Sequence, residues 1–172
     1  GGQTLGGPYA GFPTVVPEGE MTLLFLDGSH GTLLWPGGSV PIERFDIVPG
    51  GLSLPPAPNT PESGWWWNPD ESGRGFFLEW QGGVLDVAGY MYDDAGNPVW
   101  YIAVAPMGGP AGTRFSSTWL SFGGGQTLTG AWQPNHQVSN SVASLTIDFS
   151  GPDTAVMTLP NGRSTRLIRQ RF

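Results

Sequence analysis

The sequence of 172 residues contains no lysine, and all seven of its basic residues are arginine, against fourteen acidic residues. The net charge of −7 weighs against a nucleic-acid-binding function, because such proteins need a basic surface that neutralises phosphates. The absence of lysine also excludes lysine isopeptide cross-links between chains. We therefore expect no nucleic-acid partner, and any assembly of this chain would depend on non-covalent contacts.

Cysteine is absent as well, which excludes a disulfide framework and any thiolate metal site. No apolar run approaches the ~18 residues that a membrane-spanning helix requires, so we expect no membrane span. The amphipathic period of a helix is missing throughout the chain. Together these absences leave a β-sheet protein as the expected class.

Aromatic residues are plentiful, with eight tryptophans and nine phenylalanines, and they supply enough apolar area for a packed core. Short alternating segments recur about every 8–12 residues between glycine turns, which is typical of a meander sandwich or an up-and-down barrel. We expect an all-β fold, an antiparallel meander forming a barrel or compact sandwich of about eight strands, preceded by a β half-repeat.

The stretch from Gly64 to Trp80 organises the chain, because three successive tryptophans lead through a polar turn into an alternating strand. Proline presets φ and asparagine caps nearby backbone, so Asn68 and Pro69 are expected to start the turn. Glycines flank Arg74 where a positive φ or a close backbone approach is needed. The expected structural turn motif comprises Asn68, Pro69, Asp70, Glu71, Ser72, Gly73, Arg74 and Gly75.

A proline-rich segment divides the chain, because five prolines between residues 49 and 63 cannot donate to a β ladder. We interpret residues 49–63 as a semi-stiff linker between residues 1–48 and a complete domain at residues 64–172. Expected strands before the linker are Met21–Asp27, Thr32–Trp35, Val40–Ile47 and a weaker candidate at Thr4–Tyr9. The expected strands after it are Phe76–Trp80, Val84–Tyr92, Pro98–Ala105, Thr113–Phe122, Thr127–Trp132, Val142–Phe149, Ala155–Leu159 and Ser164–Arg171.

An internal repeat links the two parts, since the pentapeptide Gly1–Leu5 recurs unchanged as Gly124–Leu128. At an offset of 124, Thr22 and Phe25 fall on Thr146 and Phe149, and Pro36 and Gly38 fall on Pro160 and Gly162. Arg44 falls on Arg169 at an offset of 125. This pattern predicts that residues 1–48 are the back half of one repeat and residues 64–172 a complete one.

Two blocks of the complete repeat resemble a known bacterial repeat. The first is Gly-Trp-Trp-Trp-Asn-Pro-Asp-Glu-Ser-Gly-Arg-Gly from Gly64, and the second is Tyr-Asp-Asp-Ala-Gly-Asn-Pro-Val-Trp-Tyr from Tyr92. Together they are similar to a repeat of secreted Gram-negative proteins that pairs WWNPxESGxG with YDxxGxPxWY. That repeat is often attached to exported hydrolases or arrayed in surface proteins. The resemblance implies a modular protein that is secreted or lies at the cell surface.

No catalytic constellation stands out. Asp70, Glu71, Glu79 and Asp86 offer carboxylates for glycoside cleavage, which needs two of them about 5–10 Å apart. The favoured alternative is that Asp70 and Glu71 cap backbone amides while Arg74 pairs with one of them. His30 and His136 lie in no recognisable motif, and the oxygens of Asp93, Asp94 and Asn97 lack calcium-loop spacing. We expect no enzyme activity, no metal and no cofactor.

The tryptophans carry the clearest binding potential, because exposed Trp and Tyr rings can stack on sugars. Most of Trp65–Trp67, Trp80, Trp100, Trp119 and Trp132 are expected to fill the core. Neighbours on a strand face opposite sides, so Trp100 and Tyr101 cannot both be interior, and one of Trp65 and Trp66 should be partly exposed. Trp65, Trp66 and Tyr101 are therefore the candidate ligand-binding residues, with a polysaccharide as the ligand.

Self-association is the preferred function. A fragment of two to four strands is marginal alone, and its open edges can pair with further strands. The fragment at residues 1–48 either packs on residues 64–172 or receives strands or a face from another copy. We expect an extracellular structural β-module that forms a homo-oligomer or fibre, with carbohydrate binding or a passenger role in a secreted hydrolase as the alternative.

Overall fold

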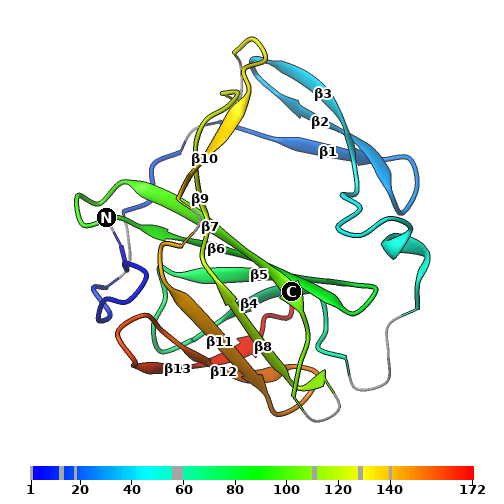
Figure 1. Cartoon of the computed structure of the whole chain (residues 1–172). Helices are drawn as coiled ribbons and strands as arrows, with labels where there is room; N and C mark the ends of the chain where they lie inside the picture. The colour runs from blue at the N-terminus through cyan, green and yellow to red at the C-terminus, as the bar shows by residue number, and fades with distance from the viewer. Residues whose placement is uncertain are drawn as a thin grey trace.

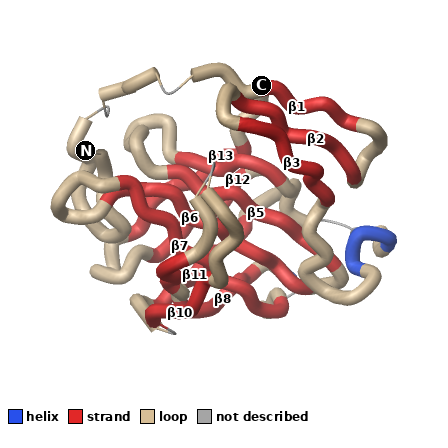
Figure 2. The backbone as a smooth tube through the Cα atoms, turned by 90° about the horizontal axis from the view of Figure 1, so that it is seen from above, coloured by secondary structure: helices blue, strands red, loops and turns tan. Residues whose placement is uncertain are grey.

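The computed structural model describes residues 2–11, 14–17, 19–55, 60–109, 112–127, 130–139 and 141–172, and every sheet in it is antiparallel. An eight-stranded sheet curls into a nearly closed barrel, and sheets of three and two strands extend from one end of it (Figure 1). The view from above shows the barrel strands grouped together, and the one short helix among the described residues lies outside them (Figure 2). The all-β expectation is confirmed.

The barrel runs in the order β7-β6-β5-β4-β13-β12-β11-β8. The two ends of this sheet meet where Ile102 on β7 and Leu120, just after β8, exchange backbone hydrogen bonds of 3.1 and 2.8 Å. The chain therefore returns through β13 to pair with β4, and this pairing joins the two halves of the domain. The strands are β4 (Gly64–Trp67), β5 (Gly75–Gln81), β6 (Val84–Tyr92), β7 (Pro98–Pro106), β8 (Arg114–Thr118), β11 (Ser144–Phe149), β12 (Thr154–Thr158) and β13 (Ser164–Arg169).

The core follows from the period of two along each strand. Alternate residues of β5 and β6 are buried, and the intervening residues face outward. Two tryptophans fill the centre, since Trp66 packs edge-on against Phe149 and Trp119 stacks on Phe76. The buried hydrophobic residues are Trp66, Phe76, Leu78, Leu85, Val87, Met91, Ala103, Phe115, Trp119, Leu145, Ile147, Phe149, Ala155, Met157, Leu159 and Leu167.

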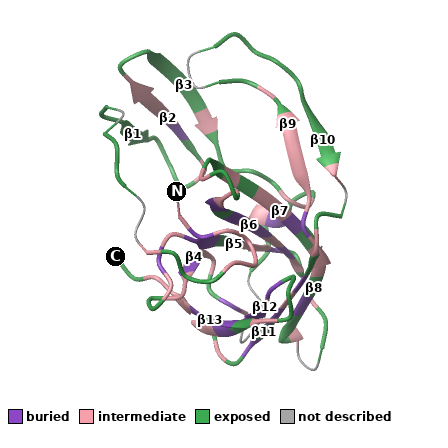
Figure 3. Cartoon of the chain, turned by 90° about the vertical axis from the view of Figure 1, so that its left-hand side faces the viewer, coloured by how far each residue is buried: buried purple, intermediate pink, exposed green. Residues whose placement is uncertain are grey.

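The sheet of β1 (Thr22–Phe25), β2 (His30–Trp35) and β3 (Gly38–Glu43) lies outside the barrel and is largely exposed (Figure 3). Its strands repeat the pairing of the barrel's last three strands. β1 pairs with β2 in the register Thr22 to Leu34 through Phe25 to Gly31, and β11 pairs with β12 in the register Thr146 to Thr158 through Phe149 to Ala155. Every pair is displaced by the offset of 124 found in the sequence. The β2–β3 pairs match β12–β13 once β3 is displaced by 125.

Polar contacts between the segment after β3 and β5 connect this outer sheet to the barrel. Arg44 forms an ion pair with Glu79 on β5. The buried Gln81 amide accepts a hydrogen bond from Ile47 N at 2.8 Å and donates one to the Phe45 carbonyl at 2.9 Å. The segment after β3 is therefore attached to the barrel, whereas the strands themselves have apolar side chains in solvent, including Leu23, Leu24 and Phe25.

Three expected strands differ from the observed ones. At Thr4–Tyr9 the described structure contains no strand, because main-chain carbonyls there bond to arginine side chains instead. The expected strand Thr113–Phe122 is divided into β8 and β9 (Ser121–Gly124) at Trp119, whose ring enters the core.

The described part of Thr127–Trp132 contains no strand, and Gly130 N bonds to the Thr127 carbonyl. The strand β10 (Asn135–Ser139) begins later and pairs with β9. Trp132, which belongs to the set of tryptophans most of which were expected in the core, is 76% exposed.

The predicted linker is not wholly extended. A short 3₁₀ helix, η1 (Gly51–Ser53), is fixed by the Asp46 carboxylate, which accepts hydrogen bonds from Gly50 N and Gly51 N. Residues 56–59 of the predicted linker, and Gly1 and Leu128 of the repeated pentapeptide, lie outside the described residues.

Candidate functional site

The turn between β4 and β5 is built as its sequence predicts. Asn68 Oδ1 accepts a hydrogen bond from Asp70 N at 3.0 Å, so the asparagine caps its own turn. Gly73 has a φ of +100°, a conformation that glycine adopts without steric cost. At Gly75 a Cβ atom would lie 2.8 Å from the Trp65 ring, so glycine permits the indole to lie across β5. Pro69 and Asp70 are exposed, whereas Ser72, Arg74 and Gly75 are buried.

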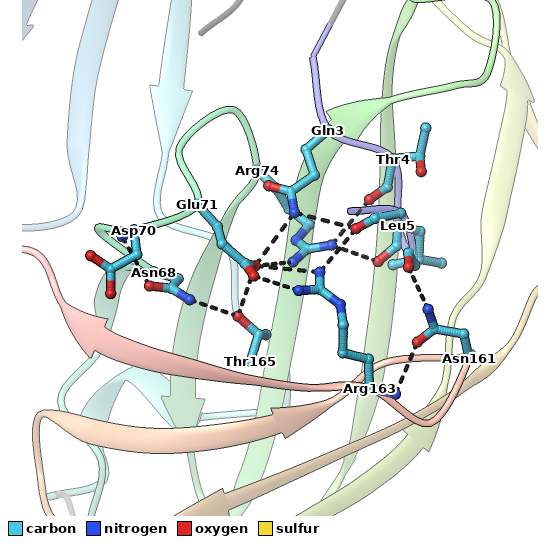
Figure 4. A network of polar contacts seen from close by, with 12 residues as sticks. Gln3, Thr4, Leu5, Asn68, Asp70, Glu71, Arg74, Asn161, Arg163 and Thr165 are labelled. Atoms are coloured by element: carbon cyan, nitrogen blue, oxygen red, sulfur yellow. Dashed lines mark hydrogen bonds and ion pairs between the residues drawn. The ribbon is translucent and has the colours of Figure 1, made fainter. Parts of the chain in front are cut away.

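This turn places the Glu71 carboxylate at the centre of a partly buried polar cluster (Figure 4). Arg74 Nη2 donates to Glu71 Oε2 at 2.9 Å, and the Thr165 hydroxyl donates to the same oxygen at 3.1 Å. Arg163, just before β13, forms an ion pair with Glu71 Oε1. We call Gln3, Glu71, Arg74, Arg163 and Thr165 the Glu71 network.

The network binds a segment from the other end of the chain, residues 3–7. Arg74 Nη1 donates to the carbonyls of Thr4 (3.1 Å) and Leu5 (2.9 Å), and Arg163 Nη2 donates to the Gly7 carbonyl at 2.9 Å. Gln3 is fully buried, and its amide lies 3.4 Å from Glu71 Oε2. With the amide turned over, its oxygen accepts from Arg74 Nη2 at 3.2 Å and its nitrogen donates to the Glu71 carbonyl at 3.1 Å.

Further hydrogen bonds hold residues near both ends of the segment at residues 3–7. Tyr92 N donates to the Gln3 carbonyl at 3.0 Å, and Asn161 Nδ2 donates to the Gly6 carbonyl at 2.7 Å. The site thus recognises the main chain of its occupant mainly through carbonyl oxygens. Such a set of donors is suited to binding a peptide segment.

The charges of the network support one another. Burial tends to raise the pKa of Glu71, but the hydrogen bonds from Arg163 and Thr165, the charge of Arg163 and the Gln3 amide bring that pKa below its ordinary value. Burial lowers the pKa of Arg74 to about 10, against the opposing charge of Glu71, so the guanidinium stays protonated at neutral pH. A buried arginine needs this carboxylate, because removal of one member of a buried pair leaves the other uncompensated.

The sequence-predicted catalytic candidates do not form an acid–base site with this network. Arg74 pairs with Glu71, as the favoured alternative expected, whereas Asp70 is exposed and its amide is capped by Asn68. The histidines lie on different sheets, His30 on β2 and His136 on β10. Asp93 and Asn97 close an ordinary hairpin loop through hydrogen bonds of 2.8 and 3.0 Å.

Among the described residues, no group of three metal-ligating side chains comes together, and no helix is long and apolar enough for a membrane crossing.

Glu79 and Asp86 are a cross-strand pair of carboxylates on β5 and β6. Glu79 is engaged by Arg44, whereas one Asp86 carboxylate oxygen is buried and has no hydrogen-bond partner among the described residues. Burial, followed by the charge of Glu79, raises the pKa of Asp86 to about 6. The pair therefore places a carboxyl of raised pKa next to a second carboxyl group.

Replacing Asp86 with asparagine is expected to stabilise the barrel by about 1 kcal/mol at pH 8 and to have little effect at pH 4. The folded-state pKa lies above the ordinary 3.8, so the penalty of ionising Asp86 is absent below pH 3.8 and is complete above about pH 6. A shift of this size corresponds to about 3 kcal/mol at most, which solvent screening of a half-exposed group reduces. Urea unfolding at both pH values measures the effect.

The control for this prediction is Asp94→Asn in the exposed loop between β6 and β7, which should change stability by less than about 0.5 kcal/mol at either pH. If Asp86→Asn changes the free energy of unfolding by the same amount at pH 4 and at pH 8, the prediction is wrong.

A second candidate site is the outer face of β4–β7, where aromatic side chains of β4, β6 and β7 lie in one row that crosses β5 at a glycine. Trp67 pairs with Gly75, Gly75 with Tyr90, and Tyr90 with Trp100. Trp65 stacks on Tyr90 with ring centroids 5.4 Å apart, and Trp100 stacks on Phe122 at 5.6 Å. We call Trp65, Trp67, Tyr90 and Trp100 the aromatic face.

An open hollow of about 540 Å³ lies over this face, lined also by Arg74 and Pro98. Its size falls within the range of small-ligand sites, about 300–1,000 Å³. Tyr90 is 46% exposed and Trp100 45% exposed, so both rings are accessible from solvent.

The structure corrects two of the three candidate ligand-binding residues. Trp66 is fully buried, because it points inward from β4 and donates its indole N–H to the Glu62 carbonyl at 2.9 Å. Tyr101 also points inward and contacts Trp119, so its neighbour Trp100 is the exposed residue. The alternation argument is confirmed for both pairs, and Trp65 alone of the three candidates lies on the aromatic face.

Sequence reasoning missed Gln3, Arg163 and Thr165, which reach Glu71 from opposite ends of the chain. A signal for Gln3 was present, because it stands in the pentapeptide that recurs at Gly124–Leu128. Comparison of the chain with family models, curated proteins and solved structures found no match.

Proposed function

We propose that this chain is a secreted or cell-surface structural protein, without enzyme activity, whose β modules associate with further copies of the same module. The observation that carries the proposal is the outer sheet. β1–β3 has the pairing register of β11–β13, but several positions that are buried in the barrel, those of Leu23, Phe25 and Val40, are exposed in the outer sheet. This equivalence also supports the assignment of residues 1–48 as the back half of a repeat.

The contrast is clearest on the first strand. Leu23 and Phe25 are 44% and 72% exposed, whereas their counterparts Ile147 and Phe149 are 0% and 8% exposed. Exposed apolar surface on a small sheet with two open edges is characteristic of an interaction site. The free energy available from covering such side chains favours association.

The barrel indicates what would cover the outer sheet. β11 pairs with β8 and β13 pairs with β4, so the front half of the module flanks these strands on both sides. In the outer sheet the corresponding edges of β1 and β3 have no partner strand among the described residues. A second copy that supplies strands or a face at these edges makes a heterologous contact, which propagates unless it closes into a ring.

Replacing Leu23 and Phe25 together with aspartate is expected to abolish self-association while leaving the barrel folded. Both side chains lie outside the barrel, and the charges would oppose burial of this face against another copy. Light scattering and negative-stain images of the native and variant chains at micromolar concentration measure the assembly. Near-ultraviolet circular dichroism reports whether the tryptophan core is retained.

Leu24→Asp is the matched control. Leu24 is 54% exposed and faces the opposite side of β1, and its counterpart in the barrel, Asp148, is already an exposed aspartate. This variant should assemble as the native chain does. A native chain that is a uniform monomer of about its own mass of 18.3 kDa, with residues 1–48 protected from protease, would overturn the proposal.

Polysaccharide binding is the second candidate function, and the aromatic face favours it. Tyr90 and Trp100 present accessible rings beside Trp65 over a hollow of suitable size. Rings held in this way can stack on the apolar faces of sugar rings.

Trp100→Ala is expected to weaken binding to an insoluble or arrayed polysaccharide by about two- to tenfold if the face binds sugar, because stacking of this kind contributes roughly 0.5–1.5 kcal/mol. Trp132→Ala removes an exposed tryptophan outside the aromatic face and should leave binding unchanged. If the native and Trp100→Ala chains bind every member of a broad glycan panel with the same affinity, this function is excluded.

A further inference from the structure

We propose that the outer sheet β1–β3 binds the central tryptophan of a Gly-Trp-Trp-Trp strand from another copy of the module. The inference rests on the proposed function and names the contact by which one copy recognises the next. The occupant is the counterpart of Trp66 on β4. The site, which we call the outer-sheet hollow, is lined by Phe25, Gly31, Ile42 and Arg44.

One face of the outer sheet is apolar throughout, and it corresponds to the interior of the barrel. The buried positions of the segment that carries β11–β13 are Leu145, Ile147, Phe149, Ala155, Met157, Leu159, Thr165 and Leu167. At the offsets of 124 and 125, their counterparts are Met21, Leu23, Phe25, Gly31, Leu33, Trp35, Val40 and Ile42. None of these counterparts is polar, so the outer sheet keeps the complete face that a front half covers in the barrel.

In the barrel this face receives Trp66. The residue pairs with Arg169 across β4 and β13, and its ring packs edge-on against Phe149. On the same face, Leu167 pairs with Ala155, and Ala155 pairs with Phe149. Trp66 is fully buried in this place, so the back half of the module has a defined seat for an indole ring.

The outer sheet has an open hollow of about 250 Å³ at the corresponding place. Its lining residues Phe25, Gly31, Ile42 and Arg44 are the counterparts of the four residues around Trp66. They share one face, because a Cβ atom on Gly31 would lie 3.4 Å from the Phe25 ring and 3.5 Å from the Ile42 side chain. A cavity of about 150 Å³ holds benzene, so this hollow has room for the larger indole.

Three hydrogen bonds hold the main chain of the β4 segment against the back half of the barrel. They join Glu62 N to the Pro152 carbonyl at 2.8 Å, Arg169 Nε to the Ser63 carbonyl at 3.0 Å, and Gln170 N to the Trp65 carbonyl at 2.7 Å. The indole N–H of Trp66 donates to the Glu62 carbonyl at 2.9 Å. The strand therefore brings the acceptor for its own indole, and the back half needs none.

The outer sheet offers the same three groups to an added strand. They are the Gly28 carbonyl, Arg44 Nε and Phe45 N, at the offsets of 124 and 125. None of the three has a hydrogen-bond partner among the described residues, since Arg44 bonds to Glu79 through Nη2. An added strand at the open edge of β3 would pair with these groups while its tryptophan fills the hollow.

The occupant comes from another molecule. The sequence has one Gly-Trp-Trp-Trp strand, and in this chain it already lies between β13 and β5. β4 joins β13 through two residue pairs, Trp66 with Arg169 and Trp67 with Ile168, and β3 has the equivalent edge. Moving the strand to β3 of another copy exchanges one contact for a similar one, which is the low-cost route of domain swapping. The released β13 edge is then open to a further copy.

The test uses the full chain and a fluorescein-labelled peptide with the sequence of residues 61–70. Two variant peptides of identical composition, Trp66→Ala and Trp65→Ala, remove rings from opposite faces of the strand. Trp66→Ala should weaken binding to the native chain by at least about tenfold, because the buried ring is lost. Trp65→Ala should weaken it by less than about threefold, since in the barrel that ring stacks on Tyr90 of its own front half. Fluorescence anisotropy measures both.

Equal affinities of the two variant peptides, or a larger loss for Trp65→Ala, would overturn the proposal. Matched variants of the chain locate the binding. Phe25→Asp should weaken binding of the native peptide by at least about tenfold, because the ring packs against the lining that this charge replaces. Leu24→Asp, on the opposite face of β1, should leave binding unchanged. Near-ultraviolet circular dichroism checks that both chains keep the barrel.

Peptide binding that survives Phe25→Asp would place the peptide elsewhere on the chain and would also overturn the proposal. The outcomes separate this contact from the proposed function. If the native chain assembles but binds both variant peptides equally, the tryptophan contact is wrong and the proposed function remains. If the chain stays monomeric but distinguishes the two variant peptides as expected, the contact remains and self-association is wrong.

Discussion

Replacing Glu71 with alanine is expected to lower the free energy of unfolding by about 3–5 kcal/mol, the cost of breaking a buried ion pair from one side. The Arg74 side chain is 2% exposed and would keep its charge without a carboxylate. Arg163 and Thr165 would lose the same acceptor, and the Gln3 amide would lose its contact with the carboxylate. Urea or thermal unfolding, followed by tryptophan fluorescence, measures the change.

The effect of Glu71 should depend on pH in a definite direction. Its pKa is below the ordinary 4.5 in the folded state, so its contribution is complete above that pH and is lost as the pH falls through the folded-state value. The difference in the free energy of unfolding between the native and Glu71→Ala chains should therefore become smaller at acid pH. Asp70→Ala, one residue away and exposed, should cost less than about 0.5 kcal/mol. Equal costs for the two substitutions would contradict the central role of Glu71.

Trp66→Ala is expected to destabilise the barrel by about 3–5 kcal/mol, the range for large-to-small changes of a buried aromatic residue. The side chain is fully buried, packs edge-on against Phe149, and satisfies the Glu62 carbonyl with its indole N–H. Its removal leaves a cavity between the two halves of the domain, where β4 pairs with β13. Chemical denaturation gives the loss directly.

Trp132→Ala is the tryptophan control, because that ring is 76% exposed on the turn before β10. It should change the free energy of unfolding by less than about 0.5 kcal/mol. The loss of unfolding free energy for Trp66→Phe should lie between those for Trp66→Ala and Trp132→Ala. The phenylalanine keeps part of the packing but leaves the Glu62 carbonyl without its donor. A Trp66→Ala chain as stable as the native one would show that the barrel does not depend on this seam.

Much of the β architecture follows from local sequence. The structure contains the strands that alternation predicts at Phe76–Trp80 and Val84–Tyr92. It also contains the turn that Asn68 and Gly73 predict. Both predictions succeed because pleat and turn geometry depend on neighbouring residues alone. The same alternation predicts that one of Trp100 and Tyr101 faces outward. It does not say which one, because the choice depends on which face of β7 meets the core.

The polar site could be predicted only in part. Arg74 and Glu71 lie three residues apart in one turn, and the sequence alone indicates that Arg74 pairs with one of its two acidic neighbours. Gln3 and Arg163 are separated from Glu71 by 68 and 92 residues, and no local pattern predicts that they meet there. That meeting requires β13 to pair with β4 and residues 3–7 to lie against the turn.

The sequence by itself determined the all-β class, the positions of most strands, and the offset that relates residues 1–48 to the end of the chain. Only the tertiary structure decided which aromatic rings are exposed, and that Gln3 is buried while its counterpart Gln126 is exposed. The physical reason is that periodicity and turns are set by adjacent residues. Burial and ion pairing, in contrast, depend on closure of the barrel, which joins strands far apart in the chain.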